Sequence, residues 1–438
     1  MKKLVALLLC LGLLGTSMAA LAADGEKTVI NLYAFTREVP EMAEKFLAMN
    51  PDIAEAYEFN PTVISTDAGT SAYEAALDLA LLEGTVDLYV AEAAFILKYA
   101  QGDAAPFAAP YKDLGIDVDA KLAEADIAGY TVEIGTNPNG DLVALGYQAT
   151  GGAFIYRRSI AIDTWGTDDP EEIAAKVGPG WEQFLVAAEE LKAKGYGIVS
   201  GDGDMWNVIE KGSETGWIVD GKLNIDPARE AYLDYSKSLT DNGYSNITQA
   251  WNDAWFADMA GSGEKPIFGF FGPAWLINYV LVNNCGDTFG DWAVCVPPVG
   301  FFWGGSWLVA ADASPNKEVL GKFIEWVTLD SSDTGLQYFW ANGIMVEGEV
   351  GTKDCVASGA VMAKSNGEVA LLGDQNMFDV FVPANAFASG KAMTQYDGVI
   401  NNQWQTYARM YAAGEISRED AIANFRQWVA DNLDVIVE

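Results

Sequence analysis

The sequence contains no histidine anywhere in its 438 residues. Histidine is the commonest general base in enzymes and the commonest neutral metal ligand in proteins, so its absence argues against imidazole catalysis and against most metal centres. No Cys-x-x-Cys pair occurs either, which removes the usual zinc and iron–sulfur signatures. We therefore predict a protein that holds no metal ion and no cofactor.

Positive charge is also scarce. Lysines and arginines number 26 against 62 aspartates and glutamates, and the formal net charge is −36 at pH 7. A field of this sign repels phosphate backbones and anionic lipids, so neither nucleic acid nor a membrane surface is expected as a partner. The simplest explanation of the charge is the solubility of an exported protein.

Long apolar runs are confined to the N-terminus. Two lysines follow Met1, the apolar run Leu4–Leu14 comes next, and small residues lead to Ala23. This order is typical of a secretory signal peptide, which we expect to span residues 1–23. Cys10 lies between two leucines inside the run, where a lipid-attachment cysteine would need small neighbours. No later stretch has the ~20 apolar residues of a membrane span, so we expect a periplasmic or secreted protein.

Three cysteines follow the predicted signal peptide, at Cys285, Cys295 and Cys355. Cys285 and Cys295 are spaced like the two ends of a hairpin and can form a disulfide in an oxidising compartment. The odd number leaves one thiol over, and the spacing is no signature of a disulfide. A bonded pair and a free pair therefore both stay open.

Strands and helices alternate over the first part of the mature chain. We predict strands at Thr28–Phe35, Tyr57–Ser65 and Val86–Val90, with helices at Glu38–Met49 and from Ser71 between them. Such alternation is typical of a parallel sheet with helices on its faces. In sheets of this kind, ligands collect where the strands end.

Polar side chains follow each of these three strands. Arg37 and Glu38 come after the first, Asp67 after the second and Glu92 after the third. Because the carboxyl ends of parallel strands meet at one edge of a sheet, these four residues are candidates for ligand binding. The alternative for each carboxylate is a solvated loop charge, which is common in so acidic a protein.

The middle of the chain gives weaker signals. Residues 103–140 read as a loop-rich region, and we expect the chain to cross into a second lobe within residues 144–153. The segment Ser200–Asn207 has the Asp-x-Asp spacing that opens a calcium loop, but it lacks the glutamate that completes one. We therefore expect a polar loop that presents the ring of Trp206.

The segment Ile267–Ala311 is rich in aromatic rings. Four tryptophans, Trp275, Trp292, Trp303 and Trp307, lie in it among glycines and prolines. Several of these rings are therefore expected on turns and at strand ends, where side chains are available for binding. The alternative for each ring is a place in a hydrophobic core.

Short motifs along the mature chain follow the order found in one protein family. They are Phe46–Ile53, Val86–Val90, Gly180–Phe184, Gly272–Trp275, Pro297–Trp307 and Ala313–Glu318. Each motif is weak alone, but together they cover nearly the whole mature length. On these motifs the chain resembles the family 1 extracellular solute-binding proteins of carbohydrate ABC importers, the group that includes maltose-binding protein.

This resemblance implies an α/β, periplasmic-binding-protein-like fold. The family has two lobes with mixed sheets flanked by helices, hinge strands between the lobes, and the ligand in the cleft. By this resemblance the first lobe comprises residues 24–146 and 299–345, and the second comprises residues 147–298 and 346–438.

The resemblance also implies a sugar ligand. A pyranose has an apolar C–H face that stacks on an aromatic ring, and hydroxyls that donate hydrogen bonds to carboxylates. The Gly-Pro-x-Trp motif that ends at Trp275 aligns with a loop that places a tryptophan under the sugar in the family. The predicted ligand-binding residues are Arg37, Glu38, Asp67, Glu92, Trp206, Trp275, Trp303 and Trp307.

The function implied is capture of a sugar or oligosaccharide by a monomeric binding protein, which is no enzyme, and delivery to the permease of an ABC transporter. Two alternatives stay open. A secreted carbohydrate-active hydrolase would use a pair of carboxylates as acid and base or nucleophile. A peptide or polyamine binder on the same fold would use acidic residues as partners for cations.

Overall fold

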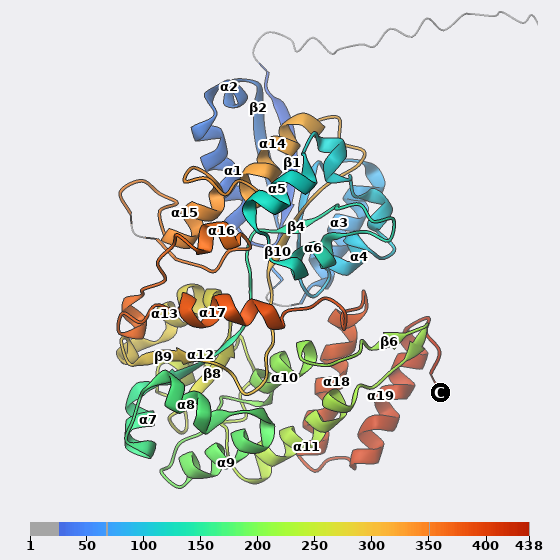
Figure 1. Ribbon diagram of the computed structural model, residues 1–438. Coiled ribbons are helices and arrows are strands. Elements are labelled where there is room, and N and C mark those ends of the chain that lie inside the picture. Colours follow the sequence, from blue (N-terminus) through green and yellow to red (C-terminus); the bar gives the residue numbers. More distant parts are fainter. Residues whose placement is uncertain (1–25, 67–68, 350, 438) are drawn as a thin grey trace, which may run out of the picture.

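A computed structural model of the chain describes residues 26–66, 69–349 and 351–437. The chain forms two bodies, one above the other in Figure 1, and several segments pass between them. We call the body that contains the N-terminal strands the first lobe and the other the second lobe. The predicted signal peptide and Asp67 lie outside the described residues.

The first lobe is built on a five-stranded sheet in the order β2-β1-β3-β10-β4. Its strands are β1 (Thr28–Ala34), β2 (Tyr57–Val63), β3 (Leu88–Glu92), β4 (Leu145–Gly146) and β10 (Ser306–Ala310). β1, β2 and β3 are parallel, as predicted, whereas β10 runs antiparallel to both β3 and β4. A strand from far along the chain thus lies inside the sheet that the N-terminal part begins.

The second lobe is built on a three-stranded sheet in the order β8-β5-β9. These strands are β5 (Ala153–Arg157), β8 (Gly269–Gly272) and β9 (Trp292–Cys295), and both pairings are antiparallel. All residues of β8 and β9 are buried, because helices and loops cover both faces of the sheet. A separate small hairpin joins β6 (Ile218–Val219) to β7 (Lys222–Leu223).

Helices flank both sheets (Figure 1). Those of the first lobe are α1 (Glu38–Met49), α2 (Pro51–Ala56), α3 (Ser71–Glu83), α4 (Ile96–Ala100), α5 (Val118–Ala125), α6 (Gly129–Gly135), α14 (Lys317–Thr328), α15 (Leu336–Asn342) and α16 (Gly359–Met362). Those of the second lobe are α7 (Arg158–Trp165), α8 (Pro170–Val177), α9 (Gly180–Lys192), α10 (Asp202–Lys211), α11 (Pro227–Asp241), α12 (Asp253–Met259), α13 (Val282–Asn284), α17 (Phe378–Ala384), α18 (Asp397–Ala412) and α19 (Arg418–Asn432). None of the helices in the described ranges has the length and apolarity that a bilayer span requires.

Several helix ends follow the local signals of the sequence. Ser417 and Asp420 form a capping box at the start of α19. Asp226 caps α11, whose first residue is a proline, and its side chain accepts from the backbone N–H of Ala228. α3 ends at Gly84, which takes the left-handed conformation with φ of 65°.

Backbone hydrogen bonds tie the segments that cross between the lobes. The N–H of Gly152 donates to the carbonyl of Phe301 at 2.9 Å, and the N–H of Trp303 donates to that of Thr150 at 3.1 Å. The N–H of Gly151 donates to the side-chain oxygen of Asn385 at 2.9 Å. Three parts of the chain therefore meet where hinge strands were expected.

The lobe boundaries taken from the family resemblance stay a prediction, and two hydrogen bonds bear on them. The N–H of Ala149 donates to the carbonyl of Cys355 at 3.0 Å, and the N–H of Ala128 donates to that of Ala357 at 2.8 Å. The chain after residue 345 thus still touches the first lobe before it reaches α17.

Two regions predicted as loops contain helices. Residues 103–140 include α5 and α6 as well as two short 3-10 helices, and most of Ser200–Asn207 forms the first turns of α10. The first prediction failed because α5 and α6 are short, and tertiary contacts stabilise short helices more than their own propensity does. The second failed because Asp202 and Asp204 act in the first turn of a helix, where carboxylates are favourable.

The three described cysteines are free thiols, and all are buried. Cys295 is the last residue of β9, whereas Cys285 follows the short helix α13, where its thiol donates to the carbonyl of Val282. The disulfide between Cys285 and Cys295 that the sequence left open is therefore not formed.

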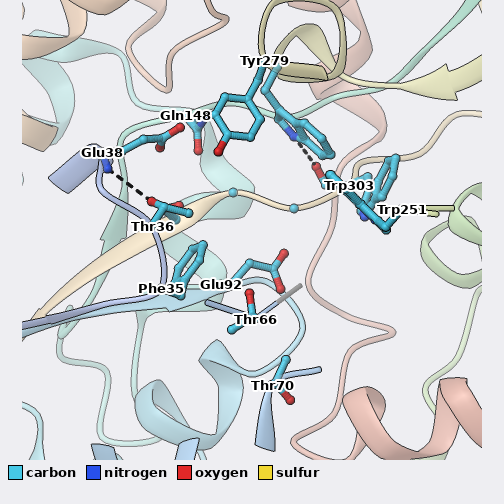
Figure 2. Close-up of a pocket in the computed structure, with 14 residues that line it drawn as sticks. Phe35, Thr36, Glu38, Thr66, Thr70, Glu92, Gln148, Trp251, Tyr279 and Trp303 are labelled. Carbon is cyan, nitrogen blue, oxygen red and sulfur yellow. Dashed lines mark hydrogen bonds between the residues drawn. The ribbon is translucent and has the colours of Figure 1, made fainter. Parts of the chain in front are cut away.

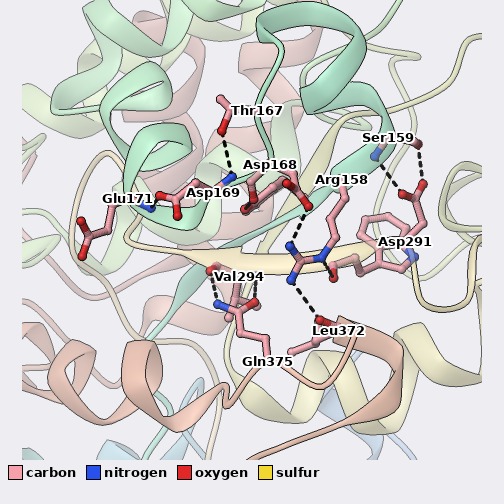
Figure 3. Close-up of polar contacts among 12 residues, drawn as sticks. Arg158, Ser159, Thr167, Asp168, Asp169, Glu171, Asp291, Val294, Leu372 and Gln375 are labelled. Carbon is pink, nitrogen blue, oxygen red and sulfur yellow. Dashed lines mark hydrogen bonds and ion pairs between the residues drawn. The ribbon is translucent and has the colours of Figure 1, made fainter.

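Side chains protect the outer edge of β9, which is an edge strand of the second sheet (Figure 3). The amide of Gln375 bonds Val294 twice, with N···O distances of 2.9 Å from the backbone N–H and 2.9 Å to the carbonyl, as a neighbouring strand would. Arg158 donates to the carbonyls of Trp292 and Leu372 at 3.0 Å each. These contacts fix the C-terminal segment against the sheet.

Candidate ligand-binding site

A cavity of about 280 Å³ lies at the carboxyl edge of the first sheet, with walls from both lobes (Figure 2). Among the described residues no lysine or arginine lines it. The lining residues are Phe35, Thr36, Glu38, Thr66, Thr70, Glu92, Gln148, Trp251, Trp275, Tyr279, Trp303, Gly304, Gly305 and Ser306.

The first-lobe wall comes from the ends of parallel strands, as the alternation of strands and helices predicted. Phe35 follows β1, Thr66 follows β2, and Glu92 is the last residue of β3. β10 enters the sheet at the same edge because it is antiparallel, and its first residue, Ser306, pairs directly with Glu92. The topology of the sheet therefore brings side chains from four segments into one cavity.

The opposite wall is aromatic (Figure 2). The ring centroids of Trp275 and Trp303 are 4.9 Å apart at an interplanar angle of 64°, and Trp251 stacks on Trp275 at 6.1 Å and 14°. The indole N–H of Trp275 donates to the backbone carbonyl of Trp303 at 3.1 Å. Because this bond satisfies the polar edge of the ring and fixes its position, the wall presents mainly apolar ring surface.

Tyr279 extends the aromatic wall from a π-helical turn, η3 (Leu276–Leu281), which directly follows Trp275. Its side chain is 55% exposed, and that of Trp251 is 43% exposed. Trp251 has a positive φ of 70°, which is unusual for a bulky residue. π-helical turns and strained backbone both occur frequently at functional sites.

Two glycines form the floor between the walls. Gly304 and Gly305 have φ values of 71° and 110°, which side chains rarely adopt. A methyl group on Gly304 would lie 3.4 Å from the indole nitrogen of Trp275 and 3.5 Å from Oε1 of Glu92. The carboxylate of the first lobe and the ring of the second lobe thus meet over this glycine.

Glu38 belongs to a polar group at one end of the cavity. The hydroxyl of Tyr147 donates to Oε2 of Glu38. Gln148 donates to Asp354 at 2.7 Å, and the indole of Trp340 donates to the same carboxylate oxygen at 3.3 Å. Burial raises the pKa of Glu38 above its usual value and raises that of Asp354 to about 7.

Glu92 lies at the centre of the cavity floor. Its Oε2 accepts a hydrogen bond from the N–H of Ala94 at 2.8 Å. Burial raises the pKa of Glu92 to about 7, although this bond and the charge of Lys211 lower it in part. The carboxyl group can therefore accept or donate a hydrogen bond near neutral pH.

Four of the eight predicted residues line the cavity: Glu38, Glu92, Trp275 and Trp303. Arg37 precedes α1 and points to solvent, with 66% of its side chain exposed and an ion pair to Glu41 at 3.8 Å. Asp67 lies outside the described residues. The four lining residues stay predictions as ligand contacts, now supported by a shared cavity.

The predictions for Trp206 and Trp307 need correction. Trp206 is 2% exposed inside α10 and packs against Trp217 and Tyr232 in the core of the second lobe. Trp307 is fully buried in the first sheet, and its indole N–H donates to the carbonyl of Thr131 at 3.1 Å. Trp307 alternates with Ser306 along β10, so its ring points to the opposite face.

Sequence reasoning did not single out several lining residues. Trp251 lies in a turn before α12 and belongs to no motif. Gln148 and Tyr279 carry no motif, because long-range packing places them. Thr36 and Thr66 lie at the predicted strand ends, so the same edge argument could have found them.

The arrangement is suited to binding a small polar molecule with an apolar face. Aromatic rings can stack on such a face, and the carboxyl, amide and hydroxyl groups opposite can bond its polar rim. Within the described ranges, no three Cys, Asp or Glu side chains are grouped so as to hold a metal ion.

Comparisons with known proteins agree with this geometry. A family model described as bacterial extracellular solute-binding protein matches residues 41–341. No curated protein sequence matches the chain. A solved extracellular solute-binding protein of family 1 has a TM-score of 0.74 and 18% identity, and the match covers 92% of this chain and 99% of that one.

Two further solved structures share the fold. The galacto-N-biose/lacto-N-biose I-binding protein of an ABC transporter from Bifidobacterium longum has a TM-score of 0.66 and 15% identity, covering 95% of this chain and 100% of that one. The ABC transporter-associated binding protein from B. animalis subsp. lactis, in complex with β-1,6-galactobiose, has a TM-score of 0.63 and 18% identity, covering 93% and 97%. At these identities the similarity shows the two-lobed fold.

Proposed function

The chain belongs to the bacterial extracellular solute-binding proteins, and from this we propose that it captures a short saccharide in the cleft between its lobes and delivers it to an ABC permease. The observation that carries the proposal is the composition of the cavity. Trp251, Trp275 and Tyr279 from the second lobe, with Trp303 beside them, face carboxyl and hydroxyl groups from the first lobe. A sugar ring has an apolar face that can stack on the aromatic wall and hydroxyls that can bond the polar wall.

The volume of the cavity supports a short ligand. At about 280 Å³ it is at the low end of the range for small-molecule sites, roughly 300–1,000 Å³. A monosaccharide or disaccharide suits this space better than a long glycan does. Solved relatives in the fold hold ligands of this kind, including β-1,6-galactobiose.

Contacts from both lobes give the ligand a means to favour the closed form. A ligand shifts a conformational equilibrium only by its difference in affinity between the two states. A sugar stacked on Trp275 and bonded to Glu92 would touch both lobes, so it would bind more tightly when the lobes close. We propose that the closed form, as a monomer outside the cytoplasm, is what the permease recognises.

A thermal-shift screen tests the proposal. We expect at least one of maltose, lacto-N-biose and β-1,6-galactobiose to raise the melting temperature, because a ligand that binds only the folded state stabilises it. We expect Trp275→Ala to weaken binding of that sugar about tenfold or more, since the ring loses its stacking contact.

Trp206→Phe is the matched control, because Trp206 is a buried tryptophan of the same lobe. It should lower the melting temperature but leave the sugar affinity unchanged. The same panel should contain spermidine and a short peptide, and the products should be checked for cleavage. Stabilisation by spermidine or the peptide alone, or release of monosaccharide, would instead favour a cation-binding protein or a hydrolase.

A further inference from the structure

Five charged side chains, from the ends of β3 and α10 and from α11 and α18, influence one another electrostatically. They are Glu92, Glu210, Lys211, Arg229 and Asp397, and we call them the interlobe charge cluster. Arg229 is fully buried and Asp397 is 1% exposed. The side chain of Lys211 is 7% exposed, although lysine is rarely buried without a partner.

Lys211 reaches the first lobe at the segment that forms the cavity floor. Its ammonium lies 5.6 Å from the centroid of the Phe302 ring. Phe302 is a core residue of the first lobe and directly precedes Trp303 and Gly304, which line the cavity. Glu92 contacts the same segment, since a methyl group on Gly304 would lie 3.5 Å from its Oε1.

The hydrogen bonds of Lys211 fix it in place. Its ammonium pairs with Glu210 at 2.6 Å, and Glu210 is itself 13% exposed. Asp397 accepts from Thr394 at 2.6 Å but leaves its second oxygen without a partner, and two nitrogens of Arg229 also lack one. The cluster is therefore a packed set of charges in a poorly solvated region, where electrostatic interactions act over longer distances.

The charges of the cluster do not balance. Three acids, Glu92, Glu210 and Asp397, face two bases, Lys211 and Arg229. Glu92 is the only member that lines the cavity, so it is the one a ligand can reach. Lys211 and Glu210 both influence Glu92 electrostatically, with opposite sign.

We propose that Lys211 is a positioning residue of the binding site, which supplies from the second lobe the positive charge that holds Glu92 as a carboxylate for the ligand. This inference rests on the proposed function for its consequence, since an ionised Glu92 accepts hydrogen bonds from ligand hydroxyls more strongly than a neutral one. It also makes the electrostatics of the first-lobe wall depend on the position of the second lobe.

The titration of Glu92 tests the proposal without any ligand. Protein labelled with carbon-13 at the glutamate carboxyl groups is followed by NMR over a range of pH, and the Glu92 signal is the one that Glu92→Gln removes. We expect its midpoint near pH 7 in the wild type. Lys211→Met should raise the midpoint on the order of one pH unit, because the stabilising charge is gone.

Three further variants separate this role from a structural one. Lys211→Arg keeps the charge and should restore the wild-type midpoint. Glu210→Gln removes a neighbouring negative charge and should lower the midpoint, which keeps the test valid if Lys211→Met does not fold. Lys98→Met is the matched control, because Lys98 is a paired, 24% exposed lysine on the first lobe and is not among the charges named as acting on Glu92.

An unchanged midpoint in both Lys211→Met and Glu210→Gln would overturn the proposal, as would an equal shift in Lys98→Met. A second arm uses maltose, lacto-N-biose and β-1,6-galactobiose at neutral pH. Lys211→Met should weaken any binding observed, and this loss should vanish in the Glu92→Gln background. If none of the sugars binds, the proposed function fails, while the titration still decides the role of Lys211.

Discussion

At the scale of single residues, Gly304 is the point at which the two walls of the cavity meet. Its positive φ of 71° lets the chain turn between Trp303 and β10. Its missing side chain leaves room for the indole of Trp275 on one side and the carboxyl group of Glu92 on the other. One glycine therefore serves both the backbone turn and the shape of the cavity.

Gly304→Ala should lower both sugar affinity and stability. The left-handed backbone costs an alanine about 1–2 kcal/mol, and the new methyl group would lie on the cavity floor. Gly140→Ala is a matched control, since Gly140 has φ of 85° and open space around it. Isothermal titration and thermal unfolding should show a stability loss in both variants and an affinity loss only in the first. Equal affinity in the two would remove Gly304 from the site.

The outcome for the tryptophans shows what the sequence can predict about single residues. Trp275 was identified because it follows a glycine and a proline in a recognisable motif, and it lines the cavity. Trp206 also lay near glycines, but those residues lead into a helix whose buried face contains the ring. Local sequence indicates a turn, whereas the direction of a side chain depends on packing that distant residues supply.

At the scale of elements, the crossing segments are closely packed. A methyl group on Gly151 would lie 2.6 Å from backbone atoms of both Ala384 and Asn385, and one on Gly152 would lie 2.0 Å from the ring of Phe301. Separations under 3.0 Å do not occur for real side chains, so something must shift. The C-terminal segment therefore takes part in the connection between the lobes.

Gly151→Ala should destabilise the protein by about 1–3 kcal/mol, as overpacking of a tight contact does. It should also separate the crossing segments and change how far the lobes close. Denaturant unfolding measures the first effect, and the radius of gyration with and without bound sugar measures the second. Gly129→Ala, at an open site with ordinary backbone, should change neither. Wild-type stability in Gly151→Ala would contradict the close approach.

The elements of the first lobe were largely predictable, because β1, β2, β3 and the helices between them carry strong local patterns. The family resemblance returned residues 299–345 to the first lobe, but the place of β10 between β3 and β4 was not predicted, since no local pattern says which strand a segment will join. The contact of Gly151 with Asn385 was not foreseen, because it joins residues far apart in the sequence.

At the scale of the whole molecule, several carboxyl groups are buried and have raised pKa values. Burial raises the pKa of Glu92, Asp204 and Asp354 to about 7 each, and it also raises that of Glu38 and Asp397. The net charge of −36 adds general repulsion among ionised groups.

Stability should therefore fall as the pH rises from about 4 to about 7. A carboxyl group with a raised pKa keeps, in the folded state, a proton that the unfolded chain has already released. Its contribution to the free energy of unfolding therefore declines as the pH rises from the unfolded-state pKa near 4 to the folded-state pKa near 7. Melting temperatures across this range test the sign. Repeating the series at about 1 M salt screens the surface repulsion and isolates the buried groups. A melting temperature that rises with pH would contradict the prediction.

The position of β10 has a consequence for how the chain is made. Synthesis begins with the strands of the first lobe, but the place between β3 and β4 in that sheet stays empty until Ser306–Ala310 have been added. The second lobe is completed later still, because α18 and α19 belong to it and lie in the last part of the chain. Contacts between distant parts of a chain form slowly. We therefore expect a newly made chain to complete its fold later than one whose lobes are completed in order.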